Sequence, residues 1–399
     1  SRAAAAAQAL SASTSSTTTA APPSKKRKRD PVDVAGTAGK RPAVNGHLQP
    51  AVSVNKSWAS GSAAATDDAS KGPVPCDDKE GHYIIVPDDM IARRYRTVRL
   101  LGQGTFGKVV EALDTETNQR VAIKIIRAIP KYRDASKIEV RVLQKLKERD
   151  PTNRHKCIHL QHWFDHRNHI CIVSELLGMC VYDFLKENEF APFPRHHIQS
   201  FARQLLGSVA FLHDLHLIHT DLKPENILLV NNGYKYVNVP AGKRNAPTRL
   251  KKILDSTDIR LGWSYPCDAF SLGCILVEFF TGVALFQTHD NLEHLAMMEH
   301  VMDKMPERFA RAGARTKPEF FKEGSKLDFP KNKITSRQSR KEVRATKSLI
   351  ELIPQTDGIN KQFYDLVKRL LTFDPAMRIT VKDALAHPYF SLRIPEDPY

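Results

Sequence analysis

The run His219-Thr220-Asp221-Leu222-Lys223-Pro224-Glu225-Asn226, which leads into the apolar Ile227-Leu228-Leu229, constrains this chain more than any other stretch. Phosphoryl transfer depends on positioning and charge neutralisation more than on covalent chemistry. In that chemistry Asp221 would orient the hydroxyl proton of an acceptor, and Lys223 would steady the transferring phosphate. Asn226 would hold a magnesium ion. Asp221, Lys223 and Asn226 are therefore the candidate catalytic residues, and Asn226 is also the candidate metal ligand.

A glycine-rich stretch with the pattern GxGxxGxV lies upstream of this run. Glycines let a backbone approach phosphate groups closely and let a hairpin fold over them. The same spacing occurs in dinucleotide folds, where the loop leads into a helix, but here it leads into the strand-like Val109-Val110. The candidate nucleotide-binding residues of this loop are Leu101, Gly102, Gln103, Gly104, Thr105, Phe106, Gly107, Lys108 and Val109.

Lys124 ends the apolar run that contains Ala122 and comes fifteen residues after Val109. A lysine in this place can reach the α- and β-phosphates of a nucleotide while the strand holds its position. Such a lysine needs a counter-charge, and Glu139 on the next predicted helix is the candidate for the ion pair. An ordinary surface glutamate in a charged helix is the alternative for Glu139.

Strand-like runs come first along the chain and helical patterns come later. The segment Lys137–Lys147 has helical spacing, with Ile138, Val142 and Leu146 on one apolar stripe. Strands before helices predict an α+β fold with a small β-rich lobe and a larger helical lobe. The strand-like runs are Tyr95–Leu101, Lys108–Ala112 and Arg120–Ile126, and the later buried helices are His197–His213 and Asp268–Phe280.

Residues 1–82 read as a disordered, low-complexity tail. Their Ala-, Ser- and Thr-rich runs, with recurring Pro and Gly, bury too little apolar surface to offset the entropy of ordering. Within this tail, Lys25-Lys26-Arg27-Lys28-Arg29 is a run of five basic residues. We interpret it as a signal for a nuclear import receptor. A solvated charge run or a nonspecific nucleic-acid contact is the alternative.

Composition excludes several classes of protein. The chain has 60 Lys and Arg against 44 Asp and Glu, a net charge of +16, which suits anionic partners without naming one. Without zinc-finger spacing or a paired-aromatic signature, direct nucleic-acid binding is not predicted. The apolar stretch Phe270–Phe286 is interrupted by Glu278 and is shorter than the roughly 20 residues of a membrane span. The six cysteines show no CxxC, so we expect reduced thiols and neither secretion nor membrane insertion.

From about Tyr95 to Phe390, these motifs together resemble a eukaryotic protein kinase. The resemblance implies a bilobal kinase fold that uses ATP and Mg²⁺, with a small lobe over residues 95–175 and a large lobe over 179–390. It further implies that Glu175 and Leu177 lie at a hinge that binds adenine through backbone groups. It places Ser174 at the gatekeeper position beside them.

Two further residues match the structural positions of the same family. Asp268 corresponds to the aspartate that braces the catalytic loop, and Arg378 to a structural arginine of the large lobe.

The stretch Glu293-His294-Leu295-Ala296-Met297-Met298-Glu299 resembles the signature of the LAMMER (Clk-type) kinases, with His300 where that family has arginine. Thr220 also agrees with this family, and it implies that activity does not depend on a phosphorylated activation loop. The resemblance implies dual-specificity activity and Arg/Ser-rich splicing factors as substrates. Together with the basic run it predicts a nuclear protein, with the cytoplasm as a second compartment.

One block of the family pattern is missing. A kinase supplies Asp-Phe-Gly and then Ala-Pro-Glu after the catalytic loop, and neither motif occurs in these 399 residues. A hairpin-like insert over Val230–Lys252 precedes Ile259-Arg260-Leu261, which runs directly into Gly262. The motif order therefore indicates that about 30 residues are absent between Leu261 and Gly262.

Losing this block has consequences for both magnesium and stability. Asp255 and Asp258 are poor substitutes for the lost metal ligand, because both precede the strand that should deliver it. Arg378 would also lose the glutamate with which it pairs in the family, and an unpaired buried arginine would destabilise the large lobe.

Three interpretations stay open. The first is an active LAMMER kinase whose chain is incomplete here, and the second is a pseudokinase or binding module. The third is a nucleic-acid binder, which rests on net charge alone.

Overall fold

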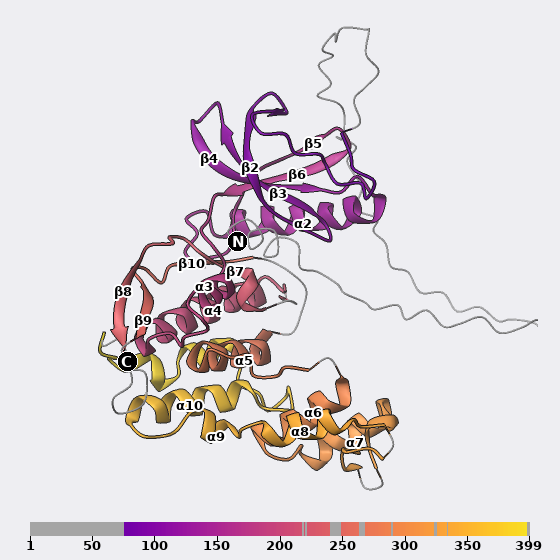
Figure 1. Cartoon of the computed structure of the whole chain (residues 1–399), viewed down its shortest axis with the longest axis vertical. Helices are drawn as coiled ribbons and strands as arrows, with labels where there is room; N and C mark the ends of the chain where they lie inside the picture. The colour runs from indigo at the N-terminus through magenta and orange to yellow at the C-terminus, as the bar shows by residue number, and fades with distance from the viewer. Residues whose placement is uncertain are drawn as a thin grey trace, which may run out of the picture. The chain divides into compact units, whose positions relative to one another are not determined.

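Apolar strands in the first ordered part of the chain form a six-stranded antiparallel sheet (Figure 1). The computed structural model describes residues 76–217, 219, 222–239, 249–262, 268–288, 290–322, 325–332 and 334–396. In the sheet order β1-β2-β3-β4-β6-β5, the strands are β1 Met90–Ile91, β2 Tyr95–Gly104, β3 Gly107–Asp114, β4 Gln119–Ile126, β6 His169–Glu175 and β5 Leu160–His166.

Strand β4 is buried on both faces, and its alternation places Lys124. Side chains of a strand point alternately to its two faces. Val121, Ile123 and Ile125 pack into the apolar cluster on one face. Ala122, Lys124 and Ile126 therefore share the other face, on which the next helix of the chain is packed.

That helix is α2, Pro130–Arg149, and it begins with Pro130 in its first turn, where a missing N–H costs nothing. Its buried residues are Ser136, Val140, Leu143 and Leu146. The predicted helix is confirmed, but Ile138 is 47% exposed, so its place on the apolar stripe is wrong. Residues spaced four and four apart rotate progressively around a helix with 3.6 residues per turn. The buried residues of α2 are instead spaced four and three apart, which keeps them on one face.

The larger lobe is helical. Its two central helices, α4 (Arg195–Asp214) and α5 (Asp268–Thr281), confirm the two long helices that the sequence predicts. Rings of Phe193, Phe201 and Phe279 meet edge-to-face at 5.1–5.5 Å between centroids in its core, a favoured aromatic geometry. The helices are α3 Val181–Glu187, α4 Arg195–Asp214, α5 Asp268–Thr281, α6 Asn291–Met302, α7 Glu307–Thr316, α8 Arg337–Ala345, α9 Leu349–Leu352, α10 Gly358–Leu370 and α11 Val381–Leu385, with 3-10 turns η1 Pro224–Asn226, η2 Pro318–Phe320 and η4 Pro388–Ser391.

Two antiparallel pairs complete this lobe. Strand β7, Ile227–Leu229, pairs with β10, Ile259–Leu261, and β8, Tyr234–Val239, pairs with β9, Arg249–Leu254. The hairpin-like insert predicted over Val230–Lys252 is thus confirmed as β8–β9. Within the residues that the structure describes, no helix is long and apolar enough to cross a bilayer.

Ordered structure begins before the sheet. An isolated antiparallel bridge joins Asp77 to Tyr83, and His82 and Tyr83 are buried, at 2% and 3% exposure. The polar character of residues 76–82 predicts that they belong to the tail, but Tyr83 inserts into the sheet's apolar cluster and orders them. The remainder of the predicted tail, residues 1–75, lies outside the described residues.

Candidate active site

A buried ion pair joins the small-lobe sheet to α2. Lys124 Nζ lies 2.8 Å from Glu139 Oε1 and 2.9 Å from Oε2, and Lys124 is only 4% exposed. The register of β4 places Lys124 opposite Val109 of β3. The lysine is therefore held beside the glycine-rich hairpin by the strand and by the carboxylate of Glu139.

The glycine-rich loop is the turn between β2 and β3, in which Gly104 pairs with Gly107. A Cβ atom on Gly107 would lie 2.0 Å from the carbonyl oxygen of Ile125, so no side chain fits there. The ring of Phe106 meets Tyr132 of α2 edge-on at 5.2 Å. Backbone packing against β4 thus requires glycine at one position of the motif.

Lys108 takes a different place from the one its position in the motif predicts. Its ammonium group donates to the carbonyl oxygen of Tyr83 at 3.0 Å and to Asp78 Oδ2 at 3.3 Å. The ammonium is thereby engaged by the segment that precedes β1, and Lys108 contributes to the loop through its backbone.

An apolar cluster lies on the remaining side of the loop. Leu101, Val109 and Ala122 are buried and pack together with the partly buried Leu176. All but Leu176 are among the predicted nucleotide-binding residues. Leu176 belongs to the predicted hinge run, between Glu175 and Leu177, but its side chain was not among the predicted contacts.

The hinge side chains face the large lobe. Glu175 Oε1 accepts from Arg260 Nε at 3.1 Å, and Leu177 packs against the cluster of Ile158, Cys180 and Leu228. Ser174 is buried at 5% exposure. The Glu175 carboxylate is thus engaged by Arg260, and its backbone carbonyl oxygen accepts from the Ser174 hydroxyl at 3.4 Å.

The catalytic loop is anchored to α5. Asp268 Oδ2 accepts from the backbone N–H of His219 at 3.0 Å and lies 2.5 Å from His213 Nε2. The role expected of Asp268 in holding this loop agrees with these contacts. Asp221 and Thr220 lie outside the described residues. Lys223 and Asn226 are described, and Asn226 is 1% exposed and donates its backbone N–H to the Lys223 carbonyl at 2.9 Å.

The β7–β10 register brings the sequence junction to Asn226. Leu261 pairs with Ile227, and the N–H of Gly262 donates to the carbonyl oxygen of Asn226 at 3.0 Å. At the opposite end of the pair, the Val230 N–H donates to the carbonyl oxygen of Asp258. A strand rises about 3.3 Å per residue, so Asp258 lies a whole strand length away from Asn226.

The residues that β10 brings beside Asn226 include no carboxylate for magnesium. Mg²⁺ is usually held by one or two carboxylates together with phosphate oxygens. Asp258 pairs with Lys156 at 3.5 Å. The Asp255 N–H donates to the Gly233 carbonyl at 2.9 Å, so both acids are at the insert end of β10, and β10 leads to Gly262 where the family pattern has a carboxylate.

Arg378 has polar and aromatic partners within the large lobe. Its Nε donates to the Thr372 carbonyl at 2.9 Å, one of its terminal nitrogens donates to the Phe373 carbonyl at 3.1 Å, and its guanidinium lies 5.2 Å from the ring centre of Phe270. The expectation of an unpaired arginine is therefore wrong.

Two carboxylates interact electrostatically beside the catalytic loop. Burial and, second to it, the charge of Glu225 raise the pKa of Glu278 on α5 to about 7. Glu225 belongs to the same loop turn as Asn226. Paired carboxylates of this kind attract a cation, because one positive charge relieves both the repulsion and the burial cost.

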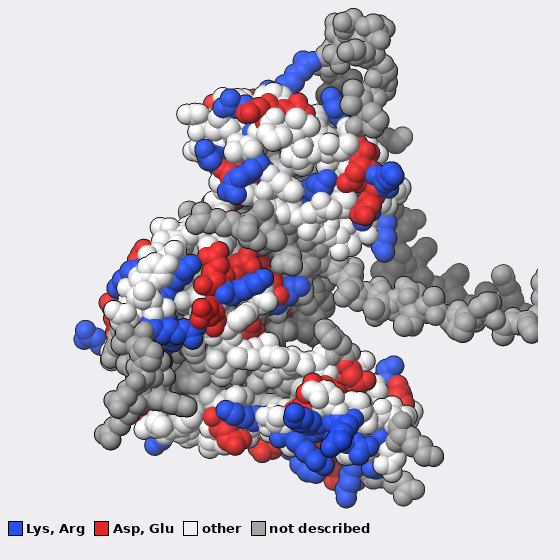
Figure 2. Space-filling view, in the orientation of Figure 1, with Lys and Arg blue, Asp and Glu red and all other residues white. Residues whose placement is uncertain are grey.

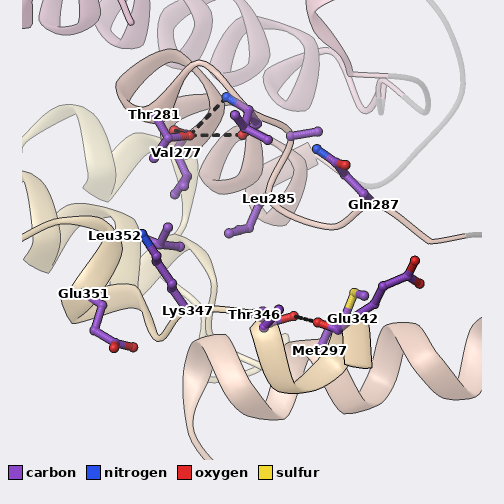
Figure 3. Close-up of a pocket in the computed structure, with 13 residues that line it drawn as sticks. Val277, Thr281, Leu285, Gln287, Met297, Glu342, Thr346, Lys347, Glu351 and Leu352 are labelled. Carbon is purple, nitrogen blue, oxygen red and sulfur yellow. Dashed lines mark hydrogen bonds between the residues drawn. The ribbon is translucent and has the colours of Figure 1, made fainter. Parts of the chain in front are cut away.

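The LAMMER-like stretch forms part of α6, and its side chains pack in the large lobe. Ala296 and Met297 join Val343 in one cluster, and Leu295 and Met298 join another. Met297 also lines a cavity of about 560 Å³ between α5, α6, α8 and α9 (Figure 3). The cavity lining contains none of the candidate catalytic residues.

Much of the excess positive charge gathers elsewhere. Lys and Arg side chains cluster over α7 and α8 in the view of Figure 2. Exposed members of this cluster include Arg308, Arg315, Arg337 and Arg344. The net charge of +16 is therefore in part a local property of this face of the large lobe.

Comparisons with known proteins agree with this geometry. The protein kinase domain profile matches residues 95–239 and 257–390, and a crystal structure of a kinase domain superposes with a TM-score of 0.71 at 27% identity, covering 78% of this chain and all of that one. The chain belongs to the protein kinase family. Within that family its relatives are kinases of the LAMMER (Clk-type) group.

Three of these relatives illustrate the match. The dual specificity protein kinase lkh1 of Schizosaccharomyces pombe is 44% identical over 356 residues, 82% of this chain and 51% of its own length. The serine/threonine-protein kinase AFC3 of Arabidopsis thaliana is 43% identical over 80% of this chain and 87% of its own. Human dual specificity protein kinase CLK2 is 38% identical over 81% and 69%. The chain thus spans about half the length of the yeast relative.

The alignment with the yeast relative also shows how many aligned positions are missing from this chain. It runs over 356 positions, but 82% of 399 residues is only about 327. About 29 aligned positions therefore have no residue in this chain. This number agrees with the block of about 30 residues that the motif order predicts between Leu261 and Gly262.

Proposed function

We propose that this protein is an ATP-dependent kinase for Ser, Thr and some Tyr hydroxyls of proteins, and that the 399-residue chain lacks part of its catalytic machinery. The observation that carries the proposal is the buried Lys124–Glu139 ion pair beside the glycine loop. Asp221, Lys223 and Asn226 are retained as well. A protein without catalytic ancestry would have no chemical need for this set.

ATP fits the small-lobe half of the site. When bound, it supplies the transferable γ-phosphoryl group. The Lys124 ammonium would bind its phosphates, with Glu139 holding the lysine in place. The backbone from Gly102 to Gly107 would cover the phosphates, and the cluster of Leu101, Val109 and Ala122 would contact the adenine.

Magnesium is where this chain departs from the family. Asn226 supplies an amide oxygen, but the residues present on β10 supply no carboxylate beside it. We therefore expect phosphoryl transfer by this chain to be severely impaired while nucleotide binding persists. An active form would carry the missing block between Leu261 and Gly262.

Arginine-rich protein segments are the substrate class we propose. The support is the carboxylate pair Glu225 and Glu278, since a guanidinium would neutralise both groups and give bidentate hydrogen bonds. Serine next to arginine would then lie near the catalytic loop, which suits Arg/Ser-rich splicing factors. The basic run Lys25–Arg29 supports a nuclear location through an import receptor, although it lies outside the described residues.

A chimera tests the kinase proposal. The corresponding block of the yeast relative is inserted after Leu261, and phosphate transfer from ATP to a peptide of Arg-Ser repeats is measured. We expect transfer near background for the present chain and clear transfer for the chimera. A folded chimera that binds ATP but transfers nothing would favour the second candidate, a nucleotide-holding binding module.

A further inference from the structure

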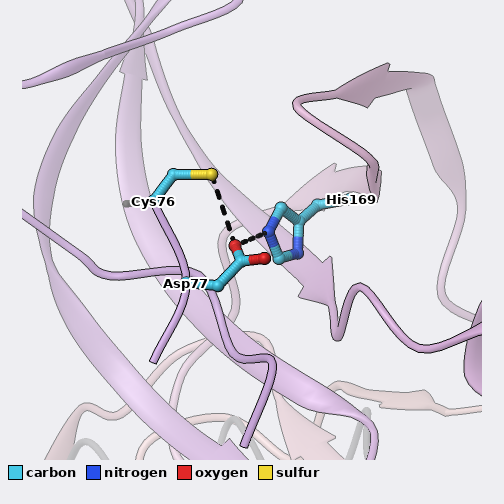
Figure 4. Close-up of side chains that lie close together, drawn as sticks. All are labelled: Cys76, Asp77 and His169. Atoms are coloured by element: carbon cyan, nitrogen blue, oxygen red, sulfur yellow. Dashed lines mark hydrogen bonds and ion pairs between the residues drawn. The ribbon is translucent and has the colours of Figure 1, made fainter. Parts of the chain in front are cut away.

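A thiol, a carboxylate and an imidazole meet where the segment before β1 crosses β6 (Figure 4). The candidate ligand atoms of Cys76, Asp77 and His169 all lie within 4.8 Å of one another. Cys76 Sγ lies 3.3 Å from Asp77 Oδ1, and His169 Nε2 lies 2.6 Å from the same oxygen. We propose that these three side chains form a zinc-binding site on the small lobe.

The imidazole is oriented as a ligand. His169 is fully buried, with 0% exposure, and its Nδ1 lies 2.7 Å from the carbonyl oxygen of Ile126. A carbonyl only accepts, so Nδ1 carries the hydrogen. Metal-binding histidines commonly donate their second nitrogen in this way, which fixes the tautomer and leaves Nε2 facing the ion.

Charge balance permits an exchange of protons for the ion. The 2.6 Å hydrogen bond between His169 Nε2 and Asp77 Oδ1 contains one proton, and the thiol of Cys76 carries a second. A zinc ion replaces these two protons and binds neutral imidazole, thiolate and carboxylate. Two protons leave to solvent and one doubly charged cation enters, so the net charge of the cluster is unchanged.

The donor set favours zinc among common divalent ions. Sulfur, nitrogen and oxygen donors together suit Zn²⁺, whereas Mg²⁺ and Ca²⁺ take oxygen ligands. Metal–ligand distances of about 2.0–2.3 Å require the Nε2–Oδ1 separation to open from 2.6 Å. The Asp77 side chain is 37% exposed, so it can make this adjustment and leaves a path for the ion. Water would take the fourth position.

The surroundings give the site a structural consequence. Cys76 packs against the apolar cluster that contains Tyr83 and Cys171. Tyr83 also meets the His169 ring edge-on at 5.2 Å. Zinc would therefore fasten the segment before β1 to β6. The next residue of that segment, Asp78, contacts Lys108 of the glycine loop.

The test is zinc content of the full chain without an affinity tag. Protein stripped with a chelator is dialysed against zinc, washed, and measured by inductively coupled plasma mass spectrometry. We expect one zinc per chain, lost in Cys76→Ser. Loss of an outer partner alone costs 10–100-fold in metal affinity, so Asp77→Asn should weaken zinc binding by about 100-fold or more.

Cys274→Ser is the matched control, since Cys274 is the other described cysteine of intermediate exposure and should leave the zinc in place. Cobalt provides a second readout, because a thiolate-to-cobalt charge-transfer band should appear in the wild type and not in Cys76→Ser. Zinc absent from the wild type, or equally retained in Cys76→Ser, would overturn the site. Nucleotide plays no part in this experiment, so its outcome is independent of the proposed kinase function.

Discussion

The backbone N–H of Gly262 donates to the carbonyl oxygen of Asn226 across 3.0 Å. This hydrogen bond brings the two sides of the sequence junction to the residue that should hold magnesium. Strand β10 reaches the right place and is paired in register with β7. The next residue after β10 is a glycine, so the strand is intact but its metal-binding continuation is absent.

Glu139→Gln should weaken both the fold and nucleotide binding. The change leaves the Lys124 ammonium, 4% exposed, without its counter-charge. Breaking a fully buried ion pair costs about 3–5 kcal/mol of stability. Because the Glu139 side chain is 18% exposed, we expect the free energy of unfolding to fall by a smaller amount, about 1–3 kcal/mol. Chemical denaturation measures the free energy of unfolding, and calorimetry measures ATP affinity. Glu148→Gln, an exposed change on the same helix, is the control and should be near neutral.

Gly107→Ala and Gly207→Ala should act in opposite directions. A Cβ atom at residue 107 would collide with the backbone oxygen of Ile125, whereas one at residue 207 meets nothing within 4 Å. The first change should destabilise the chain by at least about 1–3 kcal/mol. The second removes a helix-interior glycine and should stabilise it by up to about 1 kcal/mol. Equal unfolding midpoints for the two variants would contradict the hairpin geometry.

Glu278→Gln should change the pH dependence of stability. Because the pKa of Glu278 is raised to about 7 from an ordinary value near 4.3, the folded chain keeps a proton that the unfolded chain releases. Wild-type stability should therefore fall as pH rises from about 4.5 to 7, and the variant should lack this component. The expected gain of the variant at pH 8 is about 1–2 kcal/mol after allowing for solvent contact. Identical stability–pH profiles for the wild type and the variant would show that the pKa of Glu278 is not raised in the folded chain.

The same carboxylate gives a prediction for substrate binding. An Arg-Ser peptide should bind more tightly as pH rises through 7, because ionised Glu278 attracts guanidinium. Glu278→Gln should remove this pH dependence. A lysine-for-arginine peptide is the control, since it keeps the charge but loses the bidentate geometry. Fluorescence anisotropy of a labelled peptide between pH 6 and 8 measures the effect.

Transcripts test the origin of the junction. If the chain is incomplete, sequencing across the codons for Leu261 and Gly262 should reveal an in-frame block with Asp-Phe-Gly and Ala-Pro-Glu. Transcripts that all join these codons directly would instead favour the binding module.

Local motifs made much of the site predictable. Lys124, Glu139 and the glycine hairpin are close in sequence and lie on adjacent strands and a helix, so the motif spacing and the lysine's need for a counter-charge indicated their contact. Contacts between distant segments were not predictable in this way. Three such side-chain contacts depend on which elements pack together. They join Arg260 to Glu175, Lys108 to Asp78, and His169 to Asp77. Ile138 was misplaced because a stripe with spacing of four ignores helical drift.

The same limit explains Arg378 and the tail boundary. The sequence shows which family partner Arg378 has lost, but its contacts with the Thr372 and Phe373 carbonyls depend on the final fold. Residues 76–82 look polar and tail-like, but the buried side chain of Tyr83 packs into the apolar cluster of the sheet directly after them.

The most direct test of the central claim is ATP binding by this chain, measured by calorimetry in chelator and again in excess magnesium. We predict binding that Lys124→Met removes and that magnesium does not strengthen, because β10 presents Gly262 beside Asn226. The chimera with the restored block should bind more tightly with magnesium than without it. Strong magnesium dependence in the present chain, or no ATP binding at all, would contradict the claim.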